Sequence, residues 1–161
     1  MVEGTVWDLA ELLREVVDGL LGCDLTCLSG VEAARLAAVL EVQRRRVDAV
    51  DVRVVADLDD RGVAGEFGRT STADLLAHSL RVTPYEARQR VARARDLGPR
   101  RELTGALLEP ILPATSAALT AGEISTAHTT VIADCLDAIP TTDRGRGVRG
   151  GGVVPGAGGP V

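Results

Sequence analysis

The sequence predicts an all-α fold: a multi-helix bundle of about six helices, with one long helix and helix-turn-helix-like hairpins. Apolar residues recur at spacings of three and four from Thr5 to about Pro140, and helix start and stop signals bracket these runs. No segment of useful length alternates apolar and polar residues as a strand would. The 161 residues, 45% of them hydrophobic and 25% charged, suffice for one folded domain.

The first two helices have clear signals. An amphipathic helix is expected from Thr5 to Gly22, where glycine favours its end. Ser29 and Glu32 have the spacing of a capping box, and no Pro or Gly follows until Gly62, so we expect one long helix from about Gly30 to Arg61. Its apolar stripe has coiled-coil-like spacing, which suits a bundle or a dimer seam. The stripe consists of Leu36, Leu40, Val47, Val50, Val54 and Leu58.

Shorter helices follow. Thr83 and Glu86 flank Pro84 in the strongest start signal of the chain, a hydroxyl cap with proline at the first helical position. Gly122 and Ser125 separate the last two helices as a stop and a cap. The expected helices are about 72–80, 84–97, 113–121 and 125–139.

We place a helical domain at residues 5–140 and a low-complexity segment at 141–161. That segment is too rich in Gly and Pro for a helix or a core. Two interpretations of it stay open, a disordered tail and a frameshifted end. All 18 basic residues are Arg, which is typical of a GC-rich gene, and such DNA read out of frame yields Gly, Arg, Pro and Ala.

The charge is unevenly distributed. The net charge is −5, yet residues 81–101 hold seven arginines against two acids. The helix at 84–97 is the second helix of a helix-turn-helix outline, so these arginines are candidate phosphate contacts to DNA. They are Arg81, Arg88, Arg90, Arg93, Arg95, Arg100 and Arg101. The alternative is a structural helix, because Arg residues on both flanks of an apolar stripe are common in packed helices. That stripe is Ala87, Val91 and Ala94.

We find no catalytic site. The only histidines are His78 and His128, and no nucleophile elbow, phosphate loop or dinucleotide fingerprint is present. Cys23 and Cys27 are four residues apart, but a structural zinc site needs a second pair, so we expect no metal and small buried thiols at a helix end. No cofactor or small-molecule ligand is evident. Arg44–Arg46 in the long helix point in different directions and indicate a solvated face.

No run approaches the length of a membrane span, which needs about 20 apolar residues. The N-terminus carries acids and no basic start, unlike a signal peptide. We therefore expect a cytoplasmic protein with no membrane partner.

The order of several runs is distinctive. Gly68-Arg-Thr-Ser-Thr-Ala-Asp-Leu-Leu-Ala77 precedes Ser79–Leu97, and Leu112-Pro113 precedes Ala118–His128. Over about Leu9 to Pro140, the chain resembles the domain of unknown function 222, the helical N-terminal domain of the 13E12 repeat family. The resemblance implies a longer helical domain, commonly followed by an HNH-type endonuclease module. No nuclease residue of that module matches a position of this chain.

From the resemblance and the basic helix we expect a non-catalytic helical domain of an HNH-endonuclease-associated family that associates with DNA. Two alternatives stay open. One is a self-association module that forms a homodimer through the long helix. The other is a truncated remnant of a longer HNH-type protein, without activity of its own.

Overall fold

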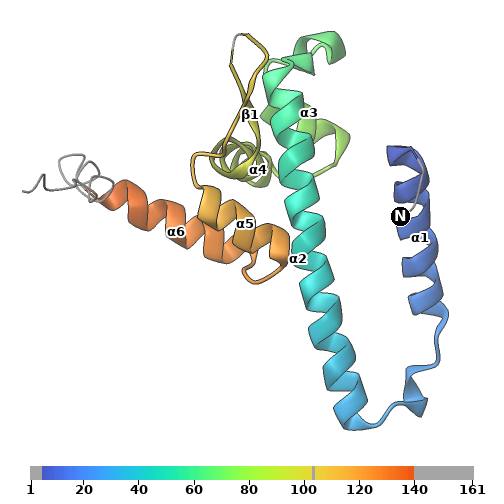
Figure 1. Cartoon of the computed structure of the whole chain (residues 1–161). Coiled ribbons are helices and arrows are strands. Elements are labelled where there is room, and N and C mark those ends of the chain that lie inside the picture. The colour runs from blue at the N-terminus through green and yellow to red at the C-terminus, as the bar shows by residue number, and fades with distance from the viewer. Residues whose placement is uncertain (1–4, 103, 140–161) are drawn as a thin grey trace, which may run out of the picture. The chain divides into compact units, whose positions relative to one another are not determined.

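The computed structural model describes residues 5–102 and 104–139 of the chain, so the expected low-complexity segment 141–161 lies outside the described residues. The all-α prediction is confirmed. The described part contains six α-helices, two short 3-10 helices and one two-stranded hairpin (Figure 1). It divides into two compact units on either side of the step from Glu41 to Val42, which falls within the long helix.

The first unit contains α1 (Val6–Gly22), the 3-10 turn η1 (Leu25–Cys27) and the start of α2 (Gly30–Asp60). Thr5 caps α1 through a capping box with Asp8, and these hydrogen bonds lower the pKa of the Asp8 carboxyl. The capping box predicted at the start of the long helix is confirmed. The Glu32 carboxylate accepts hydrogen bonds from the backbone N–H and the hydroxyl of Ser29, at 2.8 and 2.7 Å.

The expectation of buried thiols in this unit is wrong. Cys23 and Cys27 are both exposed, and their thiols donate to the carbonyl oxygens of Gly19 and Asp24. The ends of α1 and η1 that carry these thiols do not bury them, because no residue of either element is buried.

The second unit is built on the C-terminal part of α2. The 3-10 helix η2 (Val63–Phe67) leads to α3 (Thr72–Ser79) and α4 (Pro84–Leu97), which begins at the predicted Thr83 cap. The apolar stripe predicted on α4 is confirmed as buried. Its small side chains allow α4 to approach α2 and α3 closely. The shared core cluster is Val55, Ala56, Leu76, Ala87, Val91 and Ala94.

A short hairpin that the sequence does not signal follows α4. Arg100–Arg101 (β1) pairs antiparallel with Leu107–Leu108 (β2), and Gly105 adopts a positive φ of 86° in the connecting turn. A ladder of two residues per strand is too short to produce a readable alternation in sequence.

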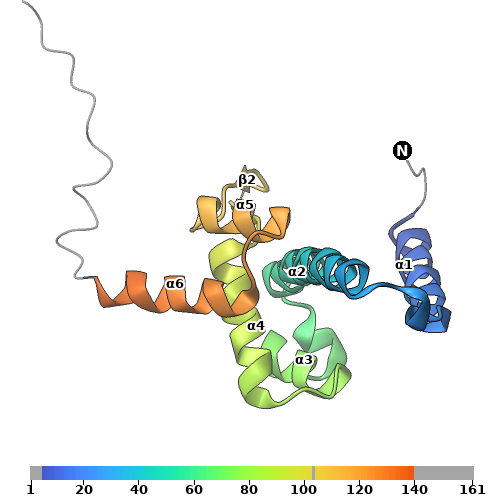
Figure 2. The same ribbon diagram turned by 90° about the horizontal axis from the view of Figure 1, so that it is seen from below.

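The last two helices, α5 (Pro113–Ala121) and α6 (Thr126–Ala138), form the expected hairpin (Figure 2). Gly122 ends α5 in the left-handed conformation, with φ at 79°. A Cβ atom there would lie 2.9 Å from the carbonyl oxygen of Val42 in α2. The guanidinium of Arg45 donates to the carbonyl oxygens of Gly122 and Glu123, so this arginine holds the turn and is not part of a purely solvated face.

Candidate functional site

Of the seven candidate arginines in residues 81–101, one group is tied to acidic residues, a second group is exposed, and Arg93 is half-buried. Arg90 donates to Asp51 of α2 at 3.3 Å and to Glu86 of α4 at 2.7 Å. Its hydrogen bond with Glu86 raises the pKa of the guanidinium. Arg95 donates through Nε to Asp59 of α2 at 2.9 Å. These two arginines therefore fasten α4 to α2, as the structural alternative for this helix anticipates.

Asp59, the partner of Arg95, also binds a residue of α3. Its other oxygen accepts the hydroxyl of buried Thr72 at 2.7 Å, which joins α3 to the same carboxylate. Burial acts to raise the pKa of Asp59, but the hydrogen bonds from Thr72 and Arg95 outweigh it and hold the pKa below its usual value. Asp59 is thus a charged junction of α2, α3 and α4.

Arg93 lies half-buried between α4, α2 and α6. Its Nε atom is buried and has no hydrogen-bond partner within the described part of the chain. Burial lowers the pKa of this guanidinium, although carboxylates at Asp48 and Asp51 oppose the effect. A guanidinium in this position is directed inward and is poorly placed to reach a DNA phosphate.

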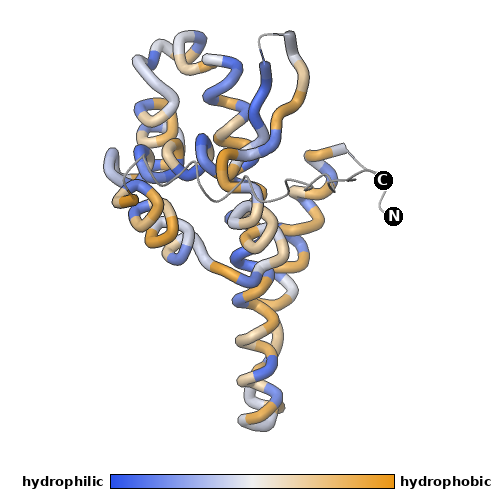
Figure 3. The backbone as a smooth tube through the Cα atoms, turned by 60° about the vertical axis from the view of Figure 1, so that its left-hand side comes forward, coloured by the Kyte–Doolittle hydropathy of each residue, from blue (hydrophilic) through white to orange (hydrophobic). Residues whose placement is uncertain are grey.

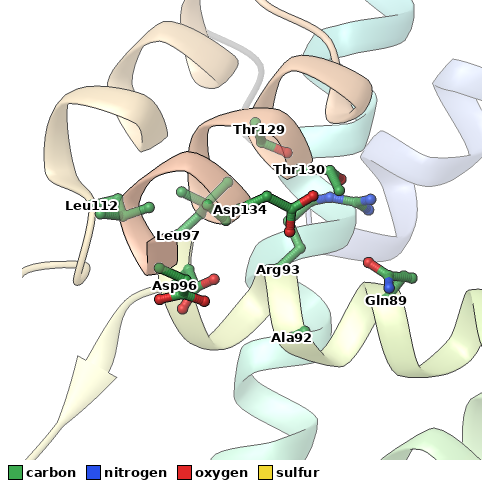
Figure 4. Close-up of a pocket in the computed structure, with 11 residues that line it drawn as sticks. Gln89, Ala92, Arg93, Asp96, Leu97, Leu112, Thr129, Thr130 and Asp134 are labelled. Carbon is green, nitrogen blue, oxygen red and sulfur yellow. The ribbon is translucent and has the colours of Figure 1, made fainter. Parts of the chain in front are cut away.

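An acidic cleft separates α4 from α6. Gln89, Arg93 and Asp96 of α4 face Thr130 and Asp134 of α6 across it (Figure 4). Burial and the nearby carboxylate of Asp137 raise the pKa of Asp96. Sequence reasoning missed this cleft because its two sides are about 40 residues apart and no motif links them. In a DNA-reading helix the outward face of α4 would meet base edges, but here α6 and its acids border that face.

The second group of arginines remains exposed. No ion pair joins a carboxylate to any of these side chains within the described residues, and Arg100 and Arg101 donate only to backbone carbonyl oxygens. Arg81 adopts a left-handed φ of 55° in the turn before α4, where helix-turn-helix motifs often carry Gly. The group comprises Arg81, Arg88, Arg100 and Arg101. The prediction of phosphate contacts stays a prediction for all seven arginines, and these four are the exposed ones that no carboxylate holds within the described residues.

A second candidate surface lies on α2. Leu58 of the predicted stripe packs against the core. The rest of the stripe is not the face that the core buries, because α2 buries Ala49, Val52, Val55 and Ala56 instead. Those residues lie on the opposite side of the helix, where small residues of α4 and Leu119 of α5 pack against them. Both faces are apolar at helical spacing, so periodicity alone could not choose between them.

We call Val47, Val50 and Val54 the α2 strip. Their side chains are 45%, 57% and 52% exposed, and Figure 3 shows that apolar positions recur along the helix. An α-helix turns by 100° per residue, which places Arg46 and Arg53 on the same side of the strip. Contiguous exposed apolar residues on a rigid helix usually mark an interaction site.

His128 serves local structure. The backbone N–H of Ser125 donates to Nδ1 of His128 at 3.2 Å, which caps α6, and His78 is exposed in the last turn of α3. Among the described residues, no three His, Cys, Asp or Glu side chains are grouped so that they could hold a metal ion. No described helix combines the length and apolarity that crossing a membrane requires.

The fold and its surfaces define an all-α domain. Its long helix has an exposed apolar strip, and Asp59 forms a charged junction of α2, α3 and α4. Residues 34–149 match the family described as "Domain of unknown function (DUF222)", and the chain belongs to this family. The match begins within α2, so α1 precedes it, and it ends beyond the described residues.

Several mycobacterial proteins are similar to this chain. "Uncharacterized protein Rv3466" of Mycobacterium tuberculosis is 38% identical over 125 residues, which is 78% of this chain and 56% of that protein. "Uncharacterized protein Rv1128c" of the same organism is 33% identical over 80% of this chain and 28% of its own length. "Uncharacterized protein Mb1179c" of Mycobacterium bovis is 40% identical over 72% and 24%. The chain thus spans between a quarter and about half of these relatives. No solved structure matches it.

Proposed function

We propose that this chain is a non-catalytic helical domain that associates with a second copy of itself through the α2 strip. The observation that carries the proposal is that α2 has two opposed apolar faces. Residues of α3, α4 and α5 cover one face, and the other is half-exposed along Val47, Val50 and Val54. Burying that second face against another helix would stabilise the folded chain by the hydrophobic effect.

The spacing of the strip favours a helical partner. Leu36 and Leu40 precede the strip at intervals of three and four through Gln43, which is the alternation of a coiled-coil seam. Leu40 is also exposed, at 42%. β-Branched valines have restricted rotamers, so they lose little side-chain entropy when a second helix packs against them.

Sedimentation equilibrium of the whole chain tests this proposal. We expect a dimer whose dissociation constant rises at least about tenfold in Val50→Glu, because the substitution places a charged carboxylate within the apolar contact. Val131→Glu is the matched control, since Val131 on α6 is 61% exposed and does not belong to the strip. A wild-type chain that stays monomeric at high concentration would overturn the proposal.

Association with DNA is a second candidate, and the four exposed arginines support it. If each contacts one phosphate, the logarithm of the affinity should fall with the logarithm of salt concentration with a slope of about −3 to −4. Arg88→Ala with Arg101→Ala should remove about two units of that slope. Arg95→Ala is the control, because its guanidinium is held by Asp59. An unchanged slope in the double variant would exclude these contacts.

We further propose that the domain acts within a family associated with HNH-type endonucleases and has no nuclease activity itself. The resemblance of its motifs supports this association, and the greater length of the relatives leaves room for further modules. Incubation of the purified chain with plasmid DNA and Mg²⁺ should leave the plasmid supercoiled. Nicking that survives repurification would contradict the proposal.

A further inference from the structure

We infer that helix α1 of one copy covers the α2 strip of a second copy. This inference rests on the proposed self-association and names the segment that makes the contact. We call Leu9, Leu13, Val16 and Leu20 the α1 face. Its residues lie within about 60° of one another around the helix, at 100° per residue. The occupant is therefore an amphipathic helix that the chain itself supplies.

Within the first unit, nothing covers the α1 face. No residue of α1 is buried, and the side chains of its face are between 38% and 51% exposed. An isolated helix of 17 residues is only marginally stable in water, so α1 needs a partner along its apolar side. The α2 strip has the same need, and a second copy satisfies both.

Charge selects the α2 strip as the partner of the α1 face. The polar side of α1 carries four acids against Arg14, a net charge of −3. That charge disfavours anionic lipid and nucleic acid, and it makes two α1 helices repel each other. The acids are Asp8, Glu11, Glu15 and Asp18. The α2 strip instead carries Arg46 and Arg53 along one edge, and neither pairs with a carboxylate within the described residues.

The register of the charges supports an antiparallel contact. Asp8 and Glu15 are seven residues apart on one side of α1, and Arg46 and Arg53 are seven apart on one edge of the α2 strip. Seven residues are close to two helical turns, so each pair projects from one side of its helix. Antiparallel packing brings equivalent edges together, and it aligns Glu15 with Arg46 when Asp8 is aligned with Arg53.

Two-fold symmetry doubles this contact. In a closed dimer each copy gives its α1 face and receives its partner's, so both apolar surfaces of both chains are covered at once. A stable interface usually buries about 800 Å² on each partner. A dimer with two helical contacts buries more surface per partner than one in which only the α2 strips meet, so it comes closer to this area.

Complementary charge reversal in the full-length chain tests the inference. One variant carries Glu15→Arg and the other carries Arg46→Glu, the two positions that the antiparallel register aligns. Each alone brings like charges together, so its homodimer should dissociate at least about tenfold more readily than the wild type. When the two variants are mixed, both contacts regain opposite charges, and a heterodimer of near wild-type affinity should form. Leu13→Glu should also weaken the wild-type dimer, whereas Leu107→Glu on the exposed hairpin should not.

The outcomes separate this inference from the proposed function. A dimer that Val50→Glu weakens but Leu13→Glu does not, with no rescue on mixing, overturns the role of α1 and leaves self-association standing. A monomeric wild type removes both. A monomer whose thermal stability falls in Leu13→Glu and in Val50→Glu shows that α1 packs within its own chain, which also overturns the inference.

Discussion

Gly122 offers the sharpest test of how α5 and α6 are attached to α2. Its φ of 79° lies in the left-handed region, where a residue with a side chain costs roughly 1–2 kcal/mol. A Cβ would also lie 2.9 Å from both the carbonyl oxygen and the Cγ1 atom of Val42. The Val42 carbonyl belongs to the backbone of α2 and cannot move cheaply, so we add about 1–3 kcal/mol for overpacking. Gly122→Ala should therefore lower the free energy of unfolding by about 2–5 kcal/mol.

Gly68→Ala is the matched control for this variant. Gly68 has a φ of 64°, but a Cβ added to it would meet nothing within 4 Å. Its substitution should cost only the conformational term of roughly 1–2 kcal/mol. Urea unfolding followed by far-ultraviolet circular dichroism measures both variants, and equal slopes would show that the unfolded states are comparable. Equal losses in the two variants would refute the close approach of Gly122 to α2.

Three further predictions concern α4 and its surroundings. Arg81→Gly should raise the free energy of unfolding by up to about 1 kcal/mol in urea titrations, because the left-handed φ of 55° no longer strains a side chain; a loss would show that the Arg81 side chain makes a stabilising contact. Thr83→Ala should lower it by about 1 kcal/mol, since the Thr83 hydroxyl caps the N–H of Glu86 at 3.1 Å, and no change would contradict that role. Asp96→Asn should stabilise the chain slightly at pH 7. The folded pKa of Asp96 is raised above its unfolded value, so its charged form opposes folding at neutral pH, and this penalty disappears as pH falls through the raised pKa. Thermal melts between pH 4 and pH 7 should show the advantage of the variant shrinking towards acid, and a constant difference would contradict the effect of burial and Asp137.

Local signals in the sequence predicted the helices well. Thr5, Ser29 and Thr83 cap the helices that they were expected to begin. Gly122 ends α5 as predicted, in the left-handed conformation. Caps and stops depend on hydrogen bonds between residues two to four positions apart, so the chain specifies them without reference to its fold.

The partners of charged side chains could not be predicted in this way. Arg90 and Arg95 were candidate phosphate contacts, but they donate to Asp51 and Asp59, which are 39 and 36 residues away in the sequence. Arg45 reaches the carbonyl oxygens that end α5, 77 and 78 residues further along. Only the packing of α4 and α5 against α2 brings these groups within hydrogen-bonding distance.

By itself, then, the sequence determined the helical class, the helix ends and the apolar stripe of α4, because each depends on local spacing and capping. The tertiary structure decided which face of α2 is buried. Both faces of that helix repeat apolar residues at helical spacing. The buried face combines Val52 and Val55 with the small side chains of Ala49 and Ala56, so neighbouring helices can approach it more closely than they could approach the strip, which has valine at all three positions. That choice leaves the α2 strip exposed and makes it the surface on which the proposed association depends.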